Sequence, residues 1–382
     1  MPYPFRSTGR TALVALASAG LVATAPAAAF ASTGHGGHSQ QHKGHGDVTL
    51  HQVNLASDLP GKAPLTDPDL KNPWGISLAP TSPLWVSDQG VDASTLYSLA
   101  PGSSTVSKSA AVRVTMPDSK LGPSGQVAYT GTGFVLSNGT TKAPAAFMFA
   151  TLDGHIEAWS PTVDPHIGNA EDKVTVPGAS YTGLAEASTG KGDELFAANF
   201  AAGTVDVFDS SFHQVKLASS QFRDRRLPKG FSPFGAQALD GHIFVTYAKP
   251  DPATGRQEVG PGIGAVDEYS TEGQLISRIA TGGALNAPWG ITIAPKGWGA
   301  ATGSLLIGNF GDGHINIFAR HGSHFANQAT GEVRVAGTGK PFAETGLWGL
   351  LPGTQTTGGT NALWFAAGIN DEKDGLLGVL RP

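Results

Sequence analysis

Cysteine is absent from the 382-residue sequence. This absence excludes a disulfide scaffold, a thiolate metal site and a cysteine nucleophile. Charge is scarce as well, because charged residues make up 14% of the chain, and 30 acidic against 25 basic side chains leave a formal net charge of −5. A nucleic-acid surface needs a basic stripe, whereas the only dense basic group is Arg223, Arg225 and Arg226, so we expect no nucleic-acid partner.

Segments with the 3.6-residue period of an amphipathic helix are also missing at useful length, which argues against α/β barrels and doubly wound sheets. In their place the sequence has 52 glycines, 26 prolines and many short apolar runs. Hydrophobic residues still make up 40% of the chain, which is enough to build a core at this length. The composition therefore predicts an all-β protein with many turns.

The N-terminus has the pattern of a secretory signal. Arg6 and Arg10 precede an uncharged apolar stretch, Thr11–Ala28, and the sequence Ala-Phe-Ala at 29–31 offers the small residues of a cleavage site. We therefore expect residues 1–31 to be a signal peptide, and the mature protein to be secreted and extracellular without a membrane span. A retained membrane anchor is the alternative, disfavoured because the stretch consists of small, weakly hydrophobic residues.

A histidine-rich segment follows at residues 32–47, with His35, His38, His42 and His45 among Gly, Ser and Gln. The segment has too few apolar residues to bury a core, so we expect a disordered linker. Flexible histidines can bind Cu²⁺, Ni²⁺ or Zn²⁺ loosely, but without a fixed geometry the solvated linker is the simpler interpretation.

One short phrase recurs about every fifty to sixty residues in the rest of the chain. Its core is a glycine followed by alternating apolar residues, and we expect the glycine to let an innermost strand begin where a Cβ would clash. These glycines are Gly75, Gly125, Gly183, Gly235, Gly290 and Gly349. Further strands with a two-residue period follow each phrase. The repeat predicts a six-bladed β-propeller of four-stranded blades over residues 48–382.

The outer strands of each unit are placed by the same pattern. Second strands are expected at Leu84–Asp88, Phe147–Asp153, Leu195–Asn199, Ile243–Tyr247, Leu305–Asn309 and Leu363–Ala367. The more variable fourth strands are expected at Val112–Thr115, Val174–Val176, Val215–Ala218, Leu275–Ile279 and Val333–Ala336. The last unit has no such strand after Leu376–Leu380, so we expect the N-terminal strand Val48–Leu55 to pair with it and close the ring.

Aromatic residues stand before the repeated glycine in most units, namely Trp74, Phe234, Trp289 and Trp348. One interpretation is that they pack between neighbouring blades. The other is that they ring the mouth of the central channel, where they can stack on a flat ligand or a sugar. On the second interpretation these four are the candidate ligand-binding residues.

Polar turns share a face with the phrase, because the turn from the second to the third strand returns the chain to that face. The longest of these turns is Lys249–Gly264. Asp88, Asp153, Asn199 and Asn309 occupy equivalent places at the ends of second strands. Their oxygens suit Ca²⁺, which takes roughly six to eight oxygen ligands, so they form the candidate metal site with Ca²⁺ as the candidate cofactor. The alternative is that each hydrogen-bonds the backbone of its own turn.

No complete catalytic motif is recognisable, neither Gly-x-Ser-x-Gly nor His-Glu-x-x-His, so the catalytic residues are unknown. The main functional hypothesis is a non-catalytic propeller, expected to be monomeric, that binds an extracellular small molecule, glycan or protein through an acidic, aromatic-rimmed channel face. The alternative is a divalent-metal-dependent hydrolase or lyase, lactonase- or esterase-like, with its site at the central channel.

Several motifs together carry a family resemblance. They are Asn72–Ile76, Gly122–Val127, Ala287–Ile293, Ile307–Gly313, Gly346–Leu350 and Ala366–Gly375. In these motifs the chain resembles, from Val48 to Leu380, an uncharacterised family of exported bacterial propeller proteins that is related at fold level to NHL-repeat and SMP-30-like propellers. The resemblance implies a six-bladed propeller but no agreed reaction, and the distant relatives of the family include Ca²⁺-dependent lactonases and esterases.

Overall fold

β-Strands dominate the computed structural model, which describes residues 46–164 and 168–382. The predicted signal peptide and nearly all of the histidine-rich linker lie outside these residues. The only α-helix in the described ranges is the four-residue α1 (Ile369–Glu372), beside two 3-10 turns, Gln89–Val91 and Gly299–Ala301. Across the same ranges, no helix has the length and apolar character needed to cross a membrane. The expectation of an all-β protein is confirmed.

Most strands form antiparallel sheets in which consecutive strands are neighbours. The first sheet contains β3 (Pro73–Ser77), β4 (Leu84–Asp88), β5 (Ala93–Ser98), β6 (Ser107–Lys108) and β7 (Val114–Thr115). The second contains β8 (Pro123–Ala128), β11 (Phe147–Thr151), β12 (His155–Trp159) and β13 (Glu171–Thr175). The third contains β14 (Tyr181–Thr189), β15 (Gly192–Asn199) and β16 (Thr204–Asp209), and the fourth β17 (Ser232–Leu239), β18 (His242–Ala248), β19 (Ala265–Ser270) and β20 (Leu275–Thr281).

A nine-stranded sheet contains most of the remaining strands. Its order is β21 (Pro288–Ile293), β22 (Leu305–Asn309), β23 (Ile315–Phe318), β26 (Gly331–Val335), β1 (Val48–Ser57), β29 (Asp374–Arg381), β28 (Leu363–Gly368) and β27 (Leu347–Pro352), with β2 (Leu65–Thr66) paired to β1. Two small hairpins stand apart, β9 (Val135–Ser137) with β10 (Lys142–Pro144) and β24 (Arg320–His321) with β25 (His324–Phe325).

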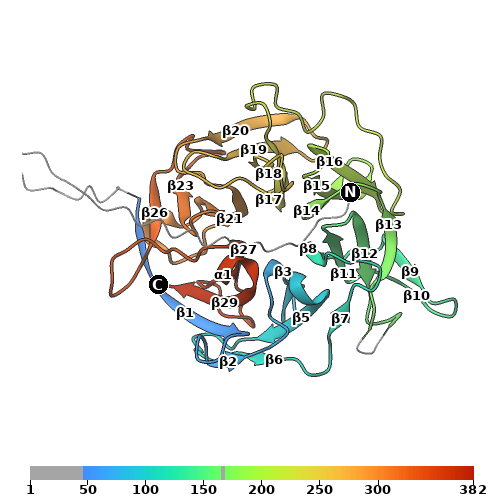
Figure 1. Ribbon diagram of the computed structural model, residues 1–382, viewed down its shortest axis with the longest axis horizontal. Coiled ribbons are helices and arrows are strands. Elements are labelled where there is room, and N and C mark those ends of the chain that lie inside the picture. The colour runs from blue at the N-terminus through green and yellow to red at the C-terminus, as the bar shows by residue number, and fades with distance from the viewer. Residues whose placement is uncertain (1–45, 165–167) are drawn as a thin grey trace, which may run out of the picture. The chain divides into compact units, whose positions relative to one another are not determined.

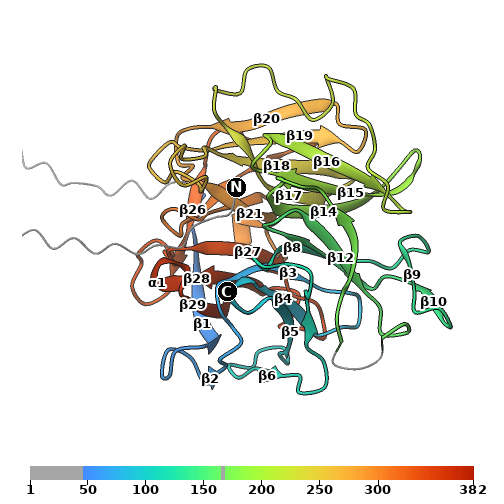
Figure 2. The ribbon, with the colours of Figure 1, turned by 45° about the vertical axis from the view of Figure 1, so that its right-hand side comes forward.

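The sheets are arranged radially about a central axis, as Figure 1 shows. Their inner strands β3, β8, β14, β17, β21 and β27 contact one another in this order, and β27 contacts β3 again. From each inner strand the next strands in the chain lie progressively further from the axis, which can be followed for β14, β15 and β16 in Figure 2. The nine-stranded sheet has an inner strand at each end, β21 and β27. This arrangement is a β-propeller.

The repeated glycines allow the inner strands to approach one another closely. A Cβ at Gly183 in β14 would lie 2.7 Å from the backbone nitrogen of Ala236 in β17, closer than real Cβ contacts come. A Cβ at Gly349 in β27 would likewise lie 2.7 Å from the carbonyl oxygen of Trp74 in β3. The expected role of the phrase glycine is therefore confirmed, because a side chain there would push the neighbouring backbones apart.

Strand β1 joins the beginning of the described chain to its end. It pairs antiparallel with β29, so the predicted pairing of Val48–Leu55 with Leu376–Leu380 is confirmed. Its first residues, Val48–Leu50, also pair in parallel with β26. β1 therefore covers edges of two strands that would otherwise be open to pairing with other chains.

The apolar core lies between neighbouring sheets. Between the first and second sheets, Trp85 of β4 stacks on Phe147 of β11, with ring centroids 3.9 Å apart and an interplanar angle of 21°. Trp159 of β12 and Met116 belong to the same buried cluster. Because each sheet buries apolar side chains on both faces, its strands contain few exposed large hydrophobic residues.

The prediction of a strand at Val215–Ala218 is wrong. Its first residue donates a hydrogen bond to the carbonyl of Val207 (2.7 Å), but the chain then leaves β16, and the third sheet has three strands. The neighbouring sheet holds the segment instead, because Phe222 packs on Tyr269 of β19 and donates its backbone N–H to Gly273 (2.8 Å). Burial of this aromatic ring outweighs the strand preference of the preceding residues.

Replacing Gly183 by alanine should lower the free energy of unfolding by about 2 kcal/mol, because the new methyl group meets backbone atoms that cannot rotate away. The control is Gly190→Ala in the turn of the same hairpin, where a Cβ has no heavy atom within 4 Å. That change should alter stability by less than about 0.5 kcal/mol. Urea denaturation followed by tryptophan fluorescence measures both, and equal effects of the two changes would contradict the packing.

Candidate functional site at the channel mouth

The four aromatic residues singled out by the sequence meet where the inner strands begin. The rings of Trp74 and Trp348 stack with their centroids 3.5 Å apart, and those of Trp289 and Phe234 lie 5.6 and 5.8 Å from Trp348. The cluster, called the aromatic plug below, also includes Leu152, Phe200 and Phe310, each of which directly follows a second strand.

The four predicted ligand-binding residues of the aromatic plug are buried. Trp74, Phe234, Trp289 and Trp348 are between 0% and 9% exposed. The structure therefore brings the four residues together, as the channel-mouth interpretation requires, but their faces are covered by one another. Stacking of a ligand on these rings stays a prediction, because it would require the plug to open.

The channel between the inner strands is narrow. A cavity of about 20 Å³ lies among them, lined by the phrase glycines of four of these strands together with Gln126 and Gln237. Such a volume holds about one water molecule. This cavity is too small for a small-molecule ligand, so the polar side chains that contact the plug are the next candidates.

Four polar side chains form a connected group against the plug, called the mouth cluster below: Asn72, Gln89, Arg256 and Glu372. The indole N–H of Trp348 donates to Asn72 Oδ1 (3.0 Å), which ties the cluster to the plug. The amide of Asn72 in turn donates to Gln89 Oε1 (2.7 Å) and to Glu372 Oε2 (3.2 Å). Arg256 completes the group with an ion pair to Glu372.

The repeat explains why these residues meet. Asn72 begins the first phrase and directly precedes β3, whereas Gln89 directly follows β4. The backbone N–H of Gln89 donates to the carbonyl of Asn72 (3.3 Å). Arg256 comes from the long turn between β18 and β19, and Glu372 comes from the turn between β28 and β29. The ion pair therefore connects two separate sheets across the mouth.

Backbone strain is concentrated beside the mouth cluster. Asn370, Asp371 and Glu372 are consecutive residues with positive φ angles of 54°, 56° and 64°. The left-handed region is uncommon for residues other than glycine, and a glutamate there has no short side chain to compensate by a local hydrogen bond. Strained conformations of this kind cost about 1–3 kcal/mol each and cluster at functional sites, which makes this turn a candidate.

Glu372 differs from the surface carboxylates in its burial and in the pKa of its carboxyl. Burial raises the pKa of its carboxyl above the usual value, although the Arg256 guanidinium and the Asn72 amide both act to lower it. The side chain of Glu372 is 12% exposed, whereas that of Arg256 is 42% exposed. A ligand arriving from solvent therefore meets the guanidinium first and the carboxyl behind it.

One hydrogen-bond donor in the plug has no partner. The indole N–H groups of Trp289 and Trp348 donate to the Thr182 carbonyl (2.7 Å) and to Asn72. Trp74 Nε1 is equally buried, yet no acceptor for it is found among the described residues. An unpaired buried donor is destabilising, and Trp74 Nε1 is such a group at the site.

The strand register shows that the four metal candidates do not all occupy equivalent positions at the ends of second strands, contrary to the prediction from the sequence. Asp88 lies opposite Pro73, and Asn309 lies opposite Pro288 in the same way. In the second sheet, however, the residue opposite Pro123 is Thr151. Asp153 therefore lies two residues beyond the position that Asp88, Asn199 and Asn309 share, and it belongs to the following turn.

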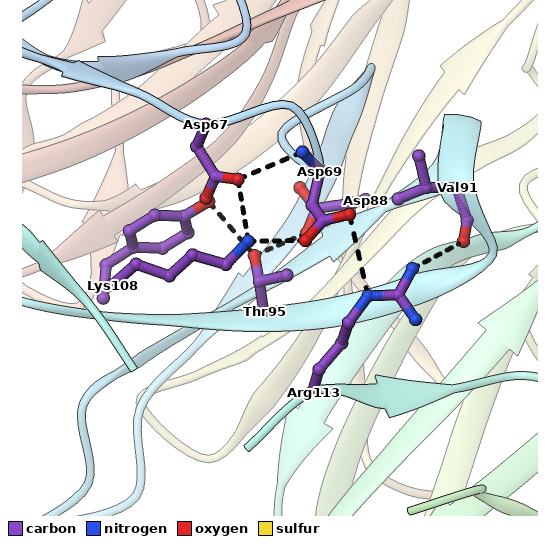
Figure 3. A network of polar contacts seen from close by, with 8 residues as sticks. Asp67, Asp69, Asp88, Val91, Thr95, Lys108 and Arg113 are labelled. Carbon is purple, nitrogen blue, oxygen red and sulfur yellow. Dashed lines mark hydrogen bonds and ion pairs between the residues drawn. The ribbon is translucent and has the colours of Figure 1, made fainter. Parts of the chain in front are cut away.

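The first two metal candidates form hydrogen bonds within single sheets, although Asp88 Oδ1 is buried without a partner among the described residues. Asp88 is fully buried and accepts a hydrogen bond from Thr95 Oγ1 (2.5 Å), within a polar network that continues to Lys108 and is drawn in Figure 3. Burial raises the pKa of Asp88 well above its usual value, which disfavours the charged form that a cation would need. Asp153 accepts hydrogen bonds from Ser119 Oγ and from the backbone N–H of Lys120, both 2.7 Å, and these hold its pKa below the usual value.

The other two metal candidates, Asn199 and Asn309, also form hydrogen bonds with nearby residues. Asn199 accepts from the backbone N–H of Ala202 (3.1 Å) and donates to Asp206 (2.8 Å) on the next strand. Asn309 accepts from the backbone N–H of Asn286 (3.1 Å) and donates to the carbonyl of Ala284 (2.8 Å).

No hydrogen bond joins any two of the four metal candidates. Within the described residues, no three His, Asp or Glu side chains are placed to hold a metal ion. A shared Ca²⁺ would have to displace the hydrogen bonds given above, so the candidate metal site stays a prediction that the geometry does not favour.

Sequence comparison finds relatives in Acanthamoeba polyphaga mimivirus. One uncharacterized protein of this virus is 31% identical over 345 residues, which cover 87% of this chain and 80% of the viral protein. A second is 30% identical over 323 residues, which cover 82% of this chain and 81% of that protein. The chain belongs to the family of these mimivirus proteins. The resemblance predicted bacterial relatives, and that part of it is corrected, because these are viral.

No family model matches the sequence. Among solved structures, an α-L-arabinofuranosidase of Fusarium graminearum in complex with an iminosugar inhibitor has a TM-score of 0.51 at 11% identity, over 87% of this chain and 97% of that one. A streptogramin B lyase reaches 0.48 at 12% identity over 87% and 97% of the two chains. A gluconolactonase of Xanthomonas campestris reaches 0.37 at 13% identity over 62% and 82%. The first of these likenesses supports the fold alone, because one fold hosts many functions.

Glu372→Gln should remove one part of the pH dependence of stability. Because the folded-state pKa of Glu372 lies above the usual value of 4.5, the folded chain binds the proton more tightly than the unfolded chain does. This stabilisation is fully present below the unfolded-state pKa and is lost as the pH rises through the folded-state pKa. Urea unfolding at a series of pH values should show a smaller loss in the variant, and an unchanged profile would contradict the buried carboxyl.

Glu157→Gln is the matched control, because it removes a second buried carboxyl far along the chain from the mouth cluster. Glu157 in β12 is 0% exposed, and burial raises its pKa to about 8. Its contribution to stability is lost between about pH 4.5 and about pH 8, and the variant should lack that loss alone. The double variant Arg256→Gln with Glu157→Gln should lose as much stability as the two single variants together, because separated sites act independently.

Proposed function

We propose that the chain is a secreted, monomeric, six-bladed β-propeller that binds an extracellular small ligand at the channel mouth without converting it. The observation that carries the proposal is the mouth cluster, in which a half-exposed arginine contacts a buried carboxyl on a strained turn above a set of packed aromatic rings. Perturbed titratable groups, strain and an unpaired buried donor gather at functional sites more often than elsewhere.

The six-blade count is supported by the inner strands, which contact one another in a closed cycle. On this count the last two blades share β1 as their connecting strand, since β1 pairs with both β26 and β29. The propeller domain would be residues 48–382, preceded by a signal peptide at 1–31 and a histidine-rich linker at 32–47. Secretion rests on the charge and apolar pattern of the first thirty-one residues.

The chemistry of the mouth cluster favours a ligand with a carboxylate and several hydroxyl groups, such as a sugar acid. A guanidinium presents parallel N–H donors that match a carboxylate in two-point contact. Such a ligand would take the place of Glu372 on Arg256. The amides of Asn72 and Gln89 then supply donors and acceptors for hydroxyl groups, and the apolar plug beneath them suits the C–H face of a sugar ring.

Isothermal titration with galacturonate tests this function, and neutral galactose serves as the matched ligand without a carboxylate. Arg256→Lys keeps the positive charge but loses the two-point geometry, so it should weaken galacturonate binding about tenfold. The control is Arg226→Lys, an exposed arginine away from the mouth cluster, which should leave binding unchanged. Equal affinity for the two sugars, or a bound ligand recovered as product, would contradict the proposal.

A second candidate function is hydrolysis of a lactone or ester at the same place. The specific observation that favours it is the buried carboxyl of Glu372, whose pKa burial raises above the usual value, as suits a group that donates a proton in catalysis. The divalent-metal-dependent form of this function would use Asp88, Asp153, Asn199 and Asn309. Each of them forms a hydrogen bond within its own sheet, and Asp88 Oδ1 is buried without a partner among the described residues.

Metal removal separates the metal-dependent form from the binding function. Because the four candidate ligands form hydrogen bonds within their own sheets and none of these bonds joins two of them, we expect dialysis against EDTA to leave the melting temperature unchanged. An ion bound only to the folded protein would instead stabilise it by about 2.7 kcal/mol at a hundredfold excess over its dissociation constant. Re-addition of CaCl₂ with a rise in melting temperature, together with one tightly bound ion by elemental analysis, would contradict this expectation.

A further inference from the structure

The third sheet ends one strand short of the pattern set by its neighbours. In the second and fourth sheets an antiparallel fourth strand, β13 or β20, covers the third strand. In the third sheet the corresponding segment turns away after one residue, and β16 becomes the outer strand (Figure 2). A cleft of about 720 Å³ opens between Thr204–Asp206 of β16 and residues 214–223.

The backbone of β16 has unused hydrogen-bonding groups in this cleft. The carbonyl of Val207 accepts from Val215 (2.7 Å), and the N–H of Asp209 donates to His213 (2.9 Å), so both residues direct their backbone groups outward. Because these directions alternate along a strand, Val205 also directs its N–H and C=O outward. Neither group has a partner among the described residues, although Val205 is only 3% exposed.

The unpaired backbone N–H and C=O groups of Val205 can pair with another strand. A buried N–H or C=O without a partner is costly, and an outer strand with free groups is a template for one more strand. The geometry of the occupant is set by the neighbouring sheets, in which the fourth strand runs antiparallel to the third. An extended peptide meets this requirement, because it carries N–H and C=O groups at the strand repeat.

The charged side chains around the cleft indicate which kind of peptide would bind there. Lys216 and Arg223 line the cleft, both are exposed, and neither forms an ion pair within the described residues. Arg225 and Arg226 follow directly, so the only dense basic group of a chain with a net charge of −5 lies beside this cleft. Asp206 also lines the cleft, but its carboxylate accepts hydrogen bonds from Tyr181, Asn199 and Thr204. The two cations without ion pairs therefore favour an acidic partner.

We propose that the edge of β16 binds an acidic, extended peptide segment of a partner protein, which adds to the third sheet as its missing fourth strand. Backbone hydrogen bonds to Val205 supply the pairing, and glutamate or aspartate side chains on the peptide contact Lys216 and Arg223. The site lies on the outer edge of one sheet and uses none of the residues of the mouth cluster, so it does not depend on the ligand bound there.

The test uses a fluorescein-labelled peptide of alternating valine and glutamate, followed by fluorescence polarisation with the full chain. A peptide of the same sequence with N-methyl groups on alternate residues lacks the backbone donors, and a valine–lysine peptide reverses the charge. We expect binding of the first peptide and loss of binding for the other two. Amide hydrogen exchange should show protection of Val205 when the first peptide is bound.

The protein variants separate charge from backbone pairing. Lys216→Glu with Arg223→Glu should weaken binding of the acidic peptide about tenfold or more, because two exposed attractive contacts become repulsive. Lys62→Glu with Lys340→Glu makes the same change of net charge at exposed sites on other turns and should leave binding unchanged. Thermal melts of both variants check that each is folded.

Three results would overturn the proposal. The first is the absence of binding at millimolar acidic peptide. The second is equal binding of the N-methylated peptide, because pairing with the strand would then play no part. The third is displacement of the peptide by heparin together with an unprotected Val205 amide, which would show a general anion-binding patch in place of a peptide site.

Discussion

The close approach of backbones at the repeated glycines is the constraint on which the rest of the structure depends. Each inner strand packs against the next through a position where a Cβ would meet backbone atoms, and the last such contact, from Gly349 to Trp74, returns to the first strand. Strand β1 supports this cycle from outside by pairing with β29 and β26. The ring is thus closed twice, by packing at the axis and by hydrogen bonds at the rim.

The same constraint produces the channel mouth. Because the inner strands begin so close together, the aromatic residues that precede the glycines have no room to stand apart, and they pack into the plug. In several sheets the residue before the inner strand then contacts the residue after the second strand. Asn72 and Gln89 meet in this way, and longer turns from two other sheets bring Arg256 and Glu372 to them. The polar chemistry of the mouth is therefore a consequence of how the repeat closes.

Features that follow from local pattern could be predicted from the sequence. The bounds Leu84–Asp88 and Leu305–Asn309 agree with the structure, because alternation and a polar turn define such strands, and the pairing of β1 with β29 followed from an unfilled edge. Other predictions failed where long-range contacts decide. Val215–Ala218 alternates like a strand, yet Phe222 is drawn to the neighbouring sheet, and the shift of Asp153 by two residues is visible only in the register. The long turn Lys249–Gly264 was placed on the candidate face, but nothing in the sequence singled out Arg256 within it, because its partner lies 116 residues away.

Closure of the ring by β1 can be measured directly with an engineered disulfide, since the chain has no cysteine to compete. Val53 lies opposite Val379 in the pairing of β1 with β29, so Val53→Cys with Val379→Cys should oxidise readily in the folded protein and raise its unfolding midpoint. Val53→Cys with Leu380→Cys is shifted by one residue, which places the second thiol on the opposite face of the sheet, and it should stay reduced. Equal oxidation of the two pairs, or of neither, would contradict the closed ring.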